Sequence, residues 1–170
     1  MAISKFLSLV NGRIREVIAT VTSVGATDEG KIVALDANGR LDNSVMPVGI
    51  GDETKSIQAS ESLSAGDVVN IWSSGGDFRV RKADATAAGK EANGFVLSSV
   101  ASGNNANVYL EGTITGLSGI TPGRYYLSTT PGQITNVPPS GSGNVVQHVG
   151  SALGGSEITF EPSDGVILAA

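Results

Sequence analysis

The segment VVNIWSSGGDFRVRK, residues 68–82, decides the fold that the sequence predicts. Its two halves are rich in β-branched and aromatic residues, which favour strands. Between the halves, residues 74–77 contain two glycines, which supply the backbone freedom that a tight turn needs. In the second half Arg79 and Arg81 alternate with Val80, so the two arginines are predicted to lie on the same side of this strand. The segment therefore predicts two paired strands of a sheet.

The same pattern of short strands and turn residues continues through residues 55–170. Thr121-Pro122-Gly123 and Thr130-Pro131-Gly132 are typical turn sequences. Many short strands at close spacing predict an antiparallel β-sandwich or barrel for this part. The best helical candidate, residues 83–92, is short enough to be a loop. Strands are expected near residues 56–60, 67–73, 78–83, 94–100, 106–115, 124–129, 133–136, 145–153, 157–161 and 166–168.

Residues 1–52 have a different character and predict a separate arm. Apolar residues recur there at spacings of three and four, which favours a helix. Gly12 interrupts the pattern, however, and residues 17–22 are rich in β-branched residues that favour a strand. We therefore expect a short helix or an irregular arm that passes into an extended segment. The apolar residues with helical spacing are Ile3, Phe6, Val10, Ile14, Val17, Val21 and Val24.

The pair Asn38-Gly39 predicts a β-hairpin within this arm, because both residues tolerate the positive φ of a tight turn. Pro47 is expected to end the unit, since proline cannot donate to a sheet ladder. A hairpin this small buries too little surface to be stable alone, so its apolar side chains need a surface from a partner or another copy. The candidate partner-binding residues of the arm and hairpin are Phe6, Leu9, Val17, Ile32, Val33, Leu35, Leu41, Val45 and Met46.

Composition excludes several classes of protein. The chain has 170 residues, no cysteine and one histidine, so a disulfide scaffold, a thiolate metal site and a multi-histidine metal site are excluded. The net charge of −5 argues against nucleic-acid binding through phosphate neutralisation. We expect no export signal and no membrane segment, because the apolar runs are too short. After Glu111 the only basic residue is Arg124, which suggests that much of this surface is covered by other copies.

Candidate catalytic residues are few, and we predict no catalytic residue, cofactor or metal. His148 lies in a strand-like run, and no serine of the chain stands in a nucleophile-elbow sequence. We therefore expect His148 to be a structural histidine. Residues 36–42 start like a calcium loop but lack its terminal glutamate, and a turn is expected. Trp72 could offer a platform for sugars, although core packing or a contact between copies is the favoured interpretation. The chain is therefore not expected to be an enzyme.

Several segments resemble virion proteins of tailed bacteriophages. The first is GATDEGKIVALDANGRLDNSVMP, residues 25–47, which in such proteins often precedes a β-rich domain. Further similar runs are GRYYLS at 123–128, PGQI at 131–134 and VVQHVGSAL at 145–153. The resemblance implies a head decoration (cement) protein or a head- or tail-fibre protein, typically a homotrimer. It is specific for phage structural proteins and not for a position on the virion.

We therefore expect a capsid decoration protein, made in the host cytoplasm and carried on the capsid surface. Residues 1–52 would dock on the major capsid protein, and residues 55–170 would form the β domain of a homotrimer. Neither nucleic acid nor a membrane is an expected partner. The alternative is a tail-fibre or baseplate component that engages the host surface. A polysaccharide depolymerase ranks third, because the sequence identifies no pair of positioned carboxylates.

Overall fold

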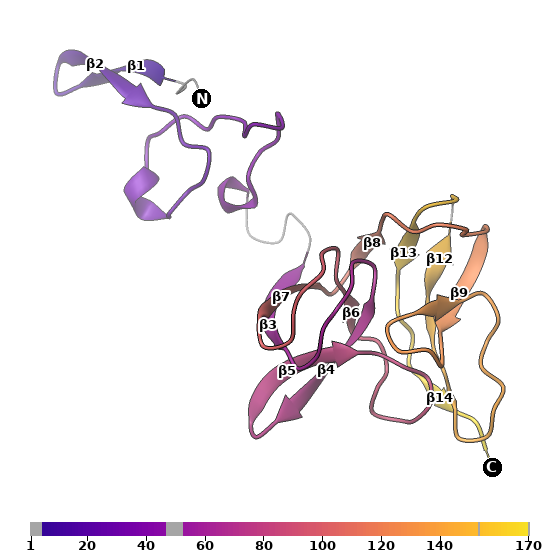
Figure 1. Cartoon of the computed structure of the whole chain (residues 1–170). Helices are drawn as coiled ribbons and strands as arrows, with labels where there is room; N and C mark the ends of the chain where they lie inside the picture. Colours follow the sequence, from indigo (N-terminus) through magenta and orange to yellow (C-terminus); the bar gives the residue numbers. More distant parts are fainter. Residues whose placement is uncertain (1–4, 47–52, 153, 170) are drawn as a thin grey trace. The chain divides into compact units, whose positions relative to one another are not determined.

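The computed structural model describes residues 5–46, 53–152 and 154–169. The chain divides into two compact units, Met1–Gly51 and Asp52–Ala170 (Figure 1). Pro47, which the sequence predicts as the end of the first unit, lies outside the described residues. The predicted domain boundary at residue 52 also lies outside the described residues. The same holds for residue 153, the last residue of the strand predicted near 145–153.

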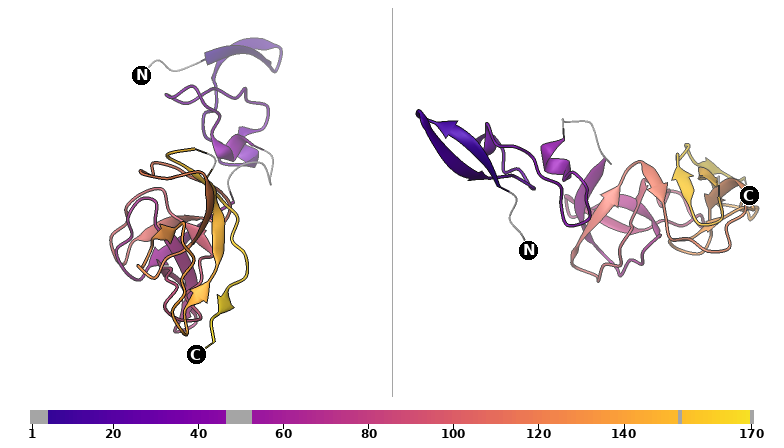
Figure 2. Two further views of the ribbon diagram at one scale, coloured as in Figure 1. Left: turned by 90° about the vertical axis from the view of Figure 1, so that its right-hand side faces the viewer. Right: turned by 90° about the horizontal axis from the view of Figure 1, so that it is seen from above.

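The first unit begins with a β-hairpin of strands β1 (Lys5–Val10) and β2 (Arg13–Ile18) (Figure 2). Asn11 and Gly12 form its two-residue turn with φ values of 52° and 74°. Two successive positive φ values are what a tight hairpin turn requires. The helical interpretation of this arm is therefore wrong, because the Asn-Gly pair reverses the chain and the residues on both sides pair as strands.

The rest of the first unit consists of turns and two short 3-10 helices, η1 (Ala26–Asp28) and η2 (Asn43–Val45). An isolated parallel bridge joins Thr20 to Val33. The backbone N–H of Thr20 donates to the carbonyl of Ile32 at 2.9 Å. Backbone pairing of this kind holds loops together, and it does not by itself bury apolar side chains.

The predicted hairpin at Asn38-Gly39 is a turn without flanking strands. Gly39 has a φ of 75°, and the N–H of Asp36 donates to the carbonyl of Arg40 at 2.8 Å. The Asp36 carboxylate also accepts the N–H groups of Asn38 and Arg40, at 2.8 and 2.9 Å. Residues 31–46 are all described, and none of them lies in a strand. The strand prediction is wrong here because a side chain takes the N–H groups that a ladder would use.

The second unit begins with a closed five-stranded barrel in the order β3-β5-β4-β6-β7. Its strands are β3 (Thr54–Ala59), β4 (Val68–Ser74), β5 (Asp77–Lys82), β6 (Gly94–Phe95) and β7 (Asn105–Tyr109). Strand β3 closes the barrel, since it pairs parallel with β5 and antiparallel with β7. Small aliphatic side chains fill the interior: Ile57, Ala59, Leu63, Val69, Val80, Val96, Ala106 and Val108.

A five-stranded antiparallel sheet follows in the order β10-β9-β12-β13-β8. Its strands are β8 (Gly112–Ile114), β9 (Gly123–Leu127), β10 (Ile134–Thr135), β12 (His148–Ala152) and β13 (Ile158–Phe160). Strands β11 (Val145–Val146) and β14 (Val166–Ile167) form a separate pair. Figure 1 shows this sheet beside the barrel, within one unit.

A second hydrophobic core joins the barrel to the sheet. Val68 and Phe95 come from barrel strands, and their partners include Leu127 and Phe160 from the sheet. The ring of Phe95 stacks on Tyr109, with centroids 5.2 Å apart, and packs against Phe160 at 5.3 Å. The prediction of a mostly β fold with a barrel and antiparallel sheets is thus confirmed.

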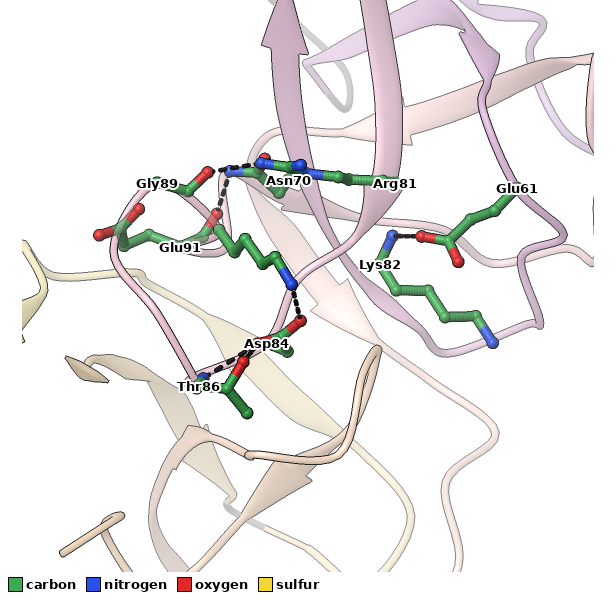
Figure 3. Close-up of polar contacts among 9 residues, drawn as sticks. Glu61, Asn70, Arg81, Lys82, Asp84, Thr86, Gly89 and Glu91 are labelled. Atoms are coloured by element: carbon green, nitrogen blue, oxygen red, sulfur yellow. Dashed lines mark hydrogen bonds and ion pairs between the residues drawn. The ribbon is translucent and has the colours of Figure 1, made fainter. Parts of the chain in front are cut away.

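The loop of residues 83–93, which includes the helical candidate of residues 83–92, contains no helix and is fastened by polar contacts (Figure 3). Arg81 donates to the carbonyl of Gly89 at 2.7 Å. Lys90 donates to the carboxylate of Asp84 at 2.9 Å, and the hydroxyl of Thr86 also donates to Asp84. Burial acts to raise the pKa of Asp84, but the hydrogen bonds from Thr86 and Lys90 outweigh it and lower that pKa. The buried carboxylate is therefore held in its charged form.

Substitution of Gly94 would test how closely the barrel strands pack. A methyl group there would lie 2.6 Å from the carbonyl oxygen of Tyr109 and 2.7 Å from the side chain of Val108. We expect Gly94→Ala to lower the free energy of unfolding by about 1–3 kcal/mol, measured by urea denaturation. Gly154→Ala is the matched control, since nothing lies within 4 Å of the added methyl. Equal stability of both variants would contradict this packing.

Candidate partner-binding surface

The first unit is unusual because it exposes its apolar side chains. None of the side chains described in residues 5–46 is buried. Among the predicted partner-binding residues, Phe6, Val17, Val45 and Met46 are half-buried, while Leu9, Ile32, Val33, Leu35 and Leu41 are exposed. Large apolar residues that lie together on a protein surface are typical of an interaction site, whereas an independent domain buries them.

One face of the β1–β2 hairpin, called here the apolar hairpin face, gathers part of this surface. It consists of Lys5, Leu7, Leu9, Ile14, Glu16 and Ile18, which cross-strand pairing places on the same side. Its four aliphatic side chains are 56–74% exposed. Lys5 Nζ lies 2.7 Å from Glu16 Oε1, so the two charges of this face neutralise each other.

The sequence analysis missed three members of this face: Leu7, Ile14 and Ile18. Helical spacing had placed Ile14 in a stripe with residues that the hairpin puts on its other side, among them Phe6 and Val17. The signal that could have found the face is the period of two along Leu7 and Leu9, followed by an Asn-Gly turn.

The segment of residues 31–46, called here the docking segment, carries a second group of exposed apolar side chains. Ile32, Val33, Leu35 and Leu41 are 43–56% exposed. A pocket of about 390 Å³ brings together predicted residues from both ends of the segment, Val33 with Val45 and Met46. The ion pair between Lys31 and Asp28, at 2.6 Å, lines the same pocket.

Three aspartates take the place of a hydrophobic core in shaping the turns around this surface. Hydrogen bonds from the Lys31 ammonium and then the Val24 N–H lower the pKa of Asp28. The N–H groups of Arg40 and Asn38 do the same for the pKa of Asp36. At Asp42 the side chain and the N–H of Ser44 lower the pKa, and that N–H donates at 2.9 Å. The charged carboxylates are therefore the acceptors that fix these turns.

In the second unit the structure brings together two of the side chains singled out by the sequence. Arg81 lies over the ring of Trp72, with its Cζ 4.8 Å from the centroid, and Phe78 is exposed near the β4–β5 turn. His148 begins strand β12, and its ring meets Tyr126 edge-on with centroids 6.0 Å apart.

A search of residues 5–46, 53–152 and 154–169 finds no cluster of three His, Asp or Glu able to hold a metal ion. No helix in the described part of the chain is long and apolar enough to cross a membrane.

Comparison with known proteins finds little. No family model matches the sequence, and no curated protein matches it. Among solved structures, part of the chain is similar to the N base of head fiber gp8.5 of bacteriophage phi29. The sequence identity is 14%, the TM-score is 0.43, and the match covers 64% of this chain and 92% of that chain.

The aspartate turns predict a pH dependence of the first unit. Asp28, Asp36 and Asp42 have lowered pKa values, so the stabilisation they give is complete above their ordinary value of 3.8 and is lost as the pH falls through the lower folded values. We expect the amide NMR signals of residues 20–46 to shift below pH 3.8, and these amides to lose protection relative to the intrinsic exchange rate at each pH. Amides of the barrel interior, such as those of Val69 and Val80, are the control. Unchanged signals of residues 20–46 down to pH 2 would contradict the role given to these carboxylates.

Proposed function

We propose that this chain is a decoration (cement) protein of a tailed-bacteriophage capsid, acting as a homotrimer. The first unit binds the assembled shell of the major capsid protein and stabilises it. The observation that carries the proposal is the exposed apolar surface of the first unit, in which no described side chain is buried. The role is structural, and no catalysis is part of it.

The energetic argument begins with the size of the first unit. A two-stranded hairpin with a few turns buries too little apolar surface to be stable by itself. Fully burying an aliphatic side chain such as Leu or Ile contributes about 1.5–3 kcal/mol. The docking segment holds four exposed Leu, Ile and Val side chains, whose burial on a partner would supply a binding energy that the unit does not use internally. A protein that binds only the assembled shell stabilises that shell by mass action.

The assignment to a capsid rests on the sequence resemblance of residues 25–47 to phage virion proteins, because the docking segment lies almost entirely within it. The second unit complements this role. It has its own barrel and sheet cores, and residues 52–170 carry eleven acidic and six basic side chains. A folded, negatively charged body suits the side of a decoration protein that faces solvent.

A tail-fibre or baseplate component that engages the host surface is the second candidate. The observation that favours it is the exposed end of the β4–β5 hairpin, where Phe78 is 74% exposed and Trp72 carries Arg81 on its ring. Aromatic and arginine side chains are enriched where proteins bind partners. Binding of the protein to host cells that is lost in Phe78→Ala would favour this candidate over the capsid role.

Capsid binding provides the direct test. Empty shells of the phage that encodes the chain should withstand higher temperature with the protein than without it, measured by the release of shell subunits on heating. We expect Ile32→Asn with Leu35→Asn to weaken binding to these shells by tenfold or more, since removing a buried apolar contact costs about 1–2 kcal/mol per site.

The matched control is Val137→Asn with Val166→Asn, which removes exposed apolar side chains of the second unit. This control should bind shells as the unmodified protein does. Shells that are equally heat-resistant with and without the protein would overturn the proposal.

A further inference from the structure

We propose that the apolar hairpin face is the contact between copies of this chain: the faces of neighbouring copies pack against one another around the axis of the homotrimer. Its place in the virion rests on the proposed function, which it deepens by assigning self-association to one surface. The docking segment is then left free for the shell.

Exposure shows that the face needs an occupant. Leu7, Leu9 and Ile14 are each more than 70% exposed, and Ile18 is 56% exposed. All four lie on one side of the two-stranded ribbon. The ribbon has no sheet stacked on this side, whereas half-buried Phe6 and Val17 lie on the other. Apolar side chains on one face of a β-ribbon are stabilised when a second apolar β face packs on them.

Charge favours another copy of the chain as the occupant. Residues 1–51 carry five basic and five acidic side chains, and residues 52–170 carry an acidic excess of five. The scarcity of basic residues after Glu111 predicts contacts between second units, but copies that met there would bring like charges together, which opposes association. On the apolar hairpin face, by contrast, the charges of Lys5 and Glu16 are already paired at 2.7 Å. This face can therefore meet its own copies without electrostatic repulsion.

The opposite face of the hairpin is less suited to meeting its own copies. Half-buried Phe6 and Val17 share it with Arg13 and Arg15, and both arginines are exposed. Bringing this face onto its own copies would gather guanidinium groups without acidic residues on the same face, which opposes association. The two faces of the hairpin are therefore not equivalent, and the contact is predicted for one of them only.

The size of the face determines how strong the contact is. Two strands of six residues form a ribbon roughly 20 Å long and two strands wide. This is smaller than a standard interface, which buries about 800 Å² on each partner. We therefore expect reversible association in the micromolar range, which becomes effectively permanent only when a shell holds several copies close together.

Sedimentation velocity of the full-length chain between about 1 and 200 μM tests the proposal, with these concentrations chosen to span the expected affinity. The unmodified protein should shift from the 17.2 kDa monomer to a trimer as the concentration rises. Leu9→Asn with Ile14→Asn should stay monomeric throughout, while the second-unit control Val137→Asn with Val166→Asn should associate like the unmodified protein.

Cross-linking locates the contact, because the chain contains no cysteine of its own. Leu9→Cys should form disulfide-linked dimers on mild oxidation at 200 μM, whereas Arg15→Cys on the opposite face should not. A monomeric unmodified protein, equal association of the Leu9→Asn with Ile14→Asn variant, or equal cross-linking of the two cysteine variants would overturn the inference.

These outcomes are distinguishable from failure of the proposed function, because no shell is present in either experiment. A monomeric chain that still stabilises shells would overturn the self-contact alone. A chain that associates through this face but does not bind shells would overturn the capsid role alone. A dimer that is lost in the Leu9→Asn with Ile14→Asn variant would correct the homotrimer and support the face.

Discussion

Hydrophobic burial is unevenly divided along this chain, and the division determines what each part can do. In the second unit, aliphatic side chains fill a barrel, and a second core joins that barrel to a sheet. In the first unit, large apolar side chains face outward and aspartate hydrogen bonds hold the turns. Because exposed apolar surface is stabilised by covering it, the contacts proposed above would add to the stability of the first unit.

The second unit, by contrast, is held together by its own internal contacts. Phe95 belongs to a barrel strand and packs against Phe160 of the sheet, so the two layers share one core. The loop of residues 83–93 is fastened to both layers, since Asn70 donates to the carbonyl of Glu91 and Gln147 of the sheet region donates to that of Ala92. The barrel, the sheet and this loop are therefore joined by side-chain packing and hydrogen bonds within the second unit.

Much of the second unit could be predicted from the sequence, because its strands are separated by residues that force turns. Arg79 and Arg81 lie on the same side of β5, as their alternation predicted, and the structure shows that Val80 between them is buried. The secondary structure of the first unit was harder to predict, since its apolar residues fit both a helical and a strand period. The structure shows that β1 pairs with β2 as strands, and such pairing cannot be recognised in a single sequence. Likewise, Asp36 captures the N–H groups beside Asn38-Gly39, and this competition is visible only in three dimensions.

The central claim is that the first unit completes its burial on a partner. Amide hydrogen exchange measures it most directly, comparing the free chain at low concentration with the chain bound to phage shells. The account predicts slower exchange in the bound state for residues 5–46, with little change in the interiors of the barrel and sheet, where burial is already complete. Equal exchange of residues 5–46 in both states, or protection confined to residues 53–169, would contradict it.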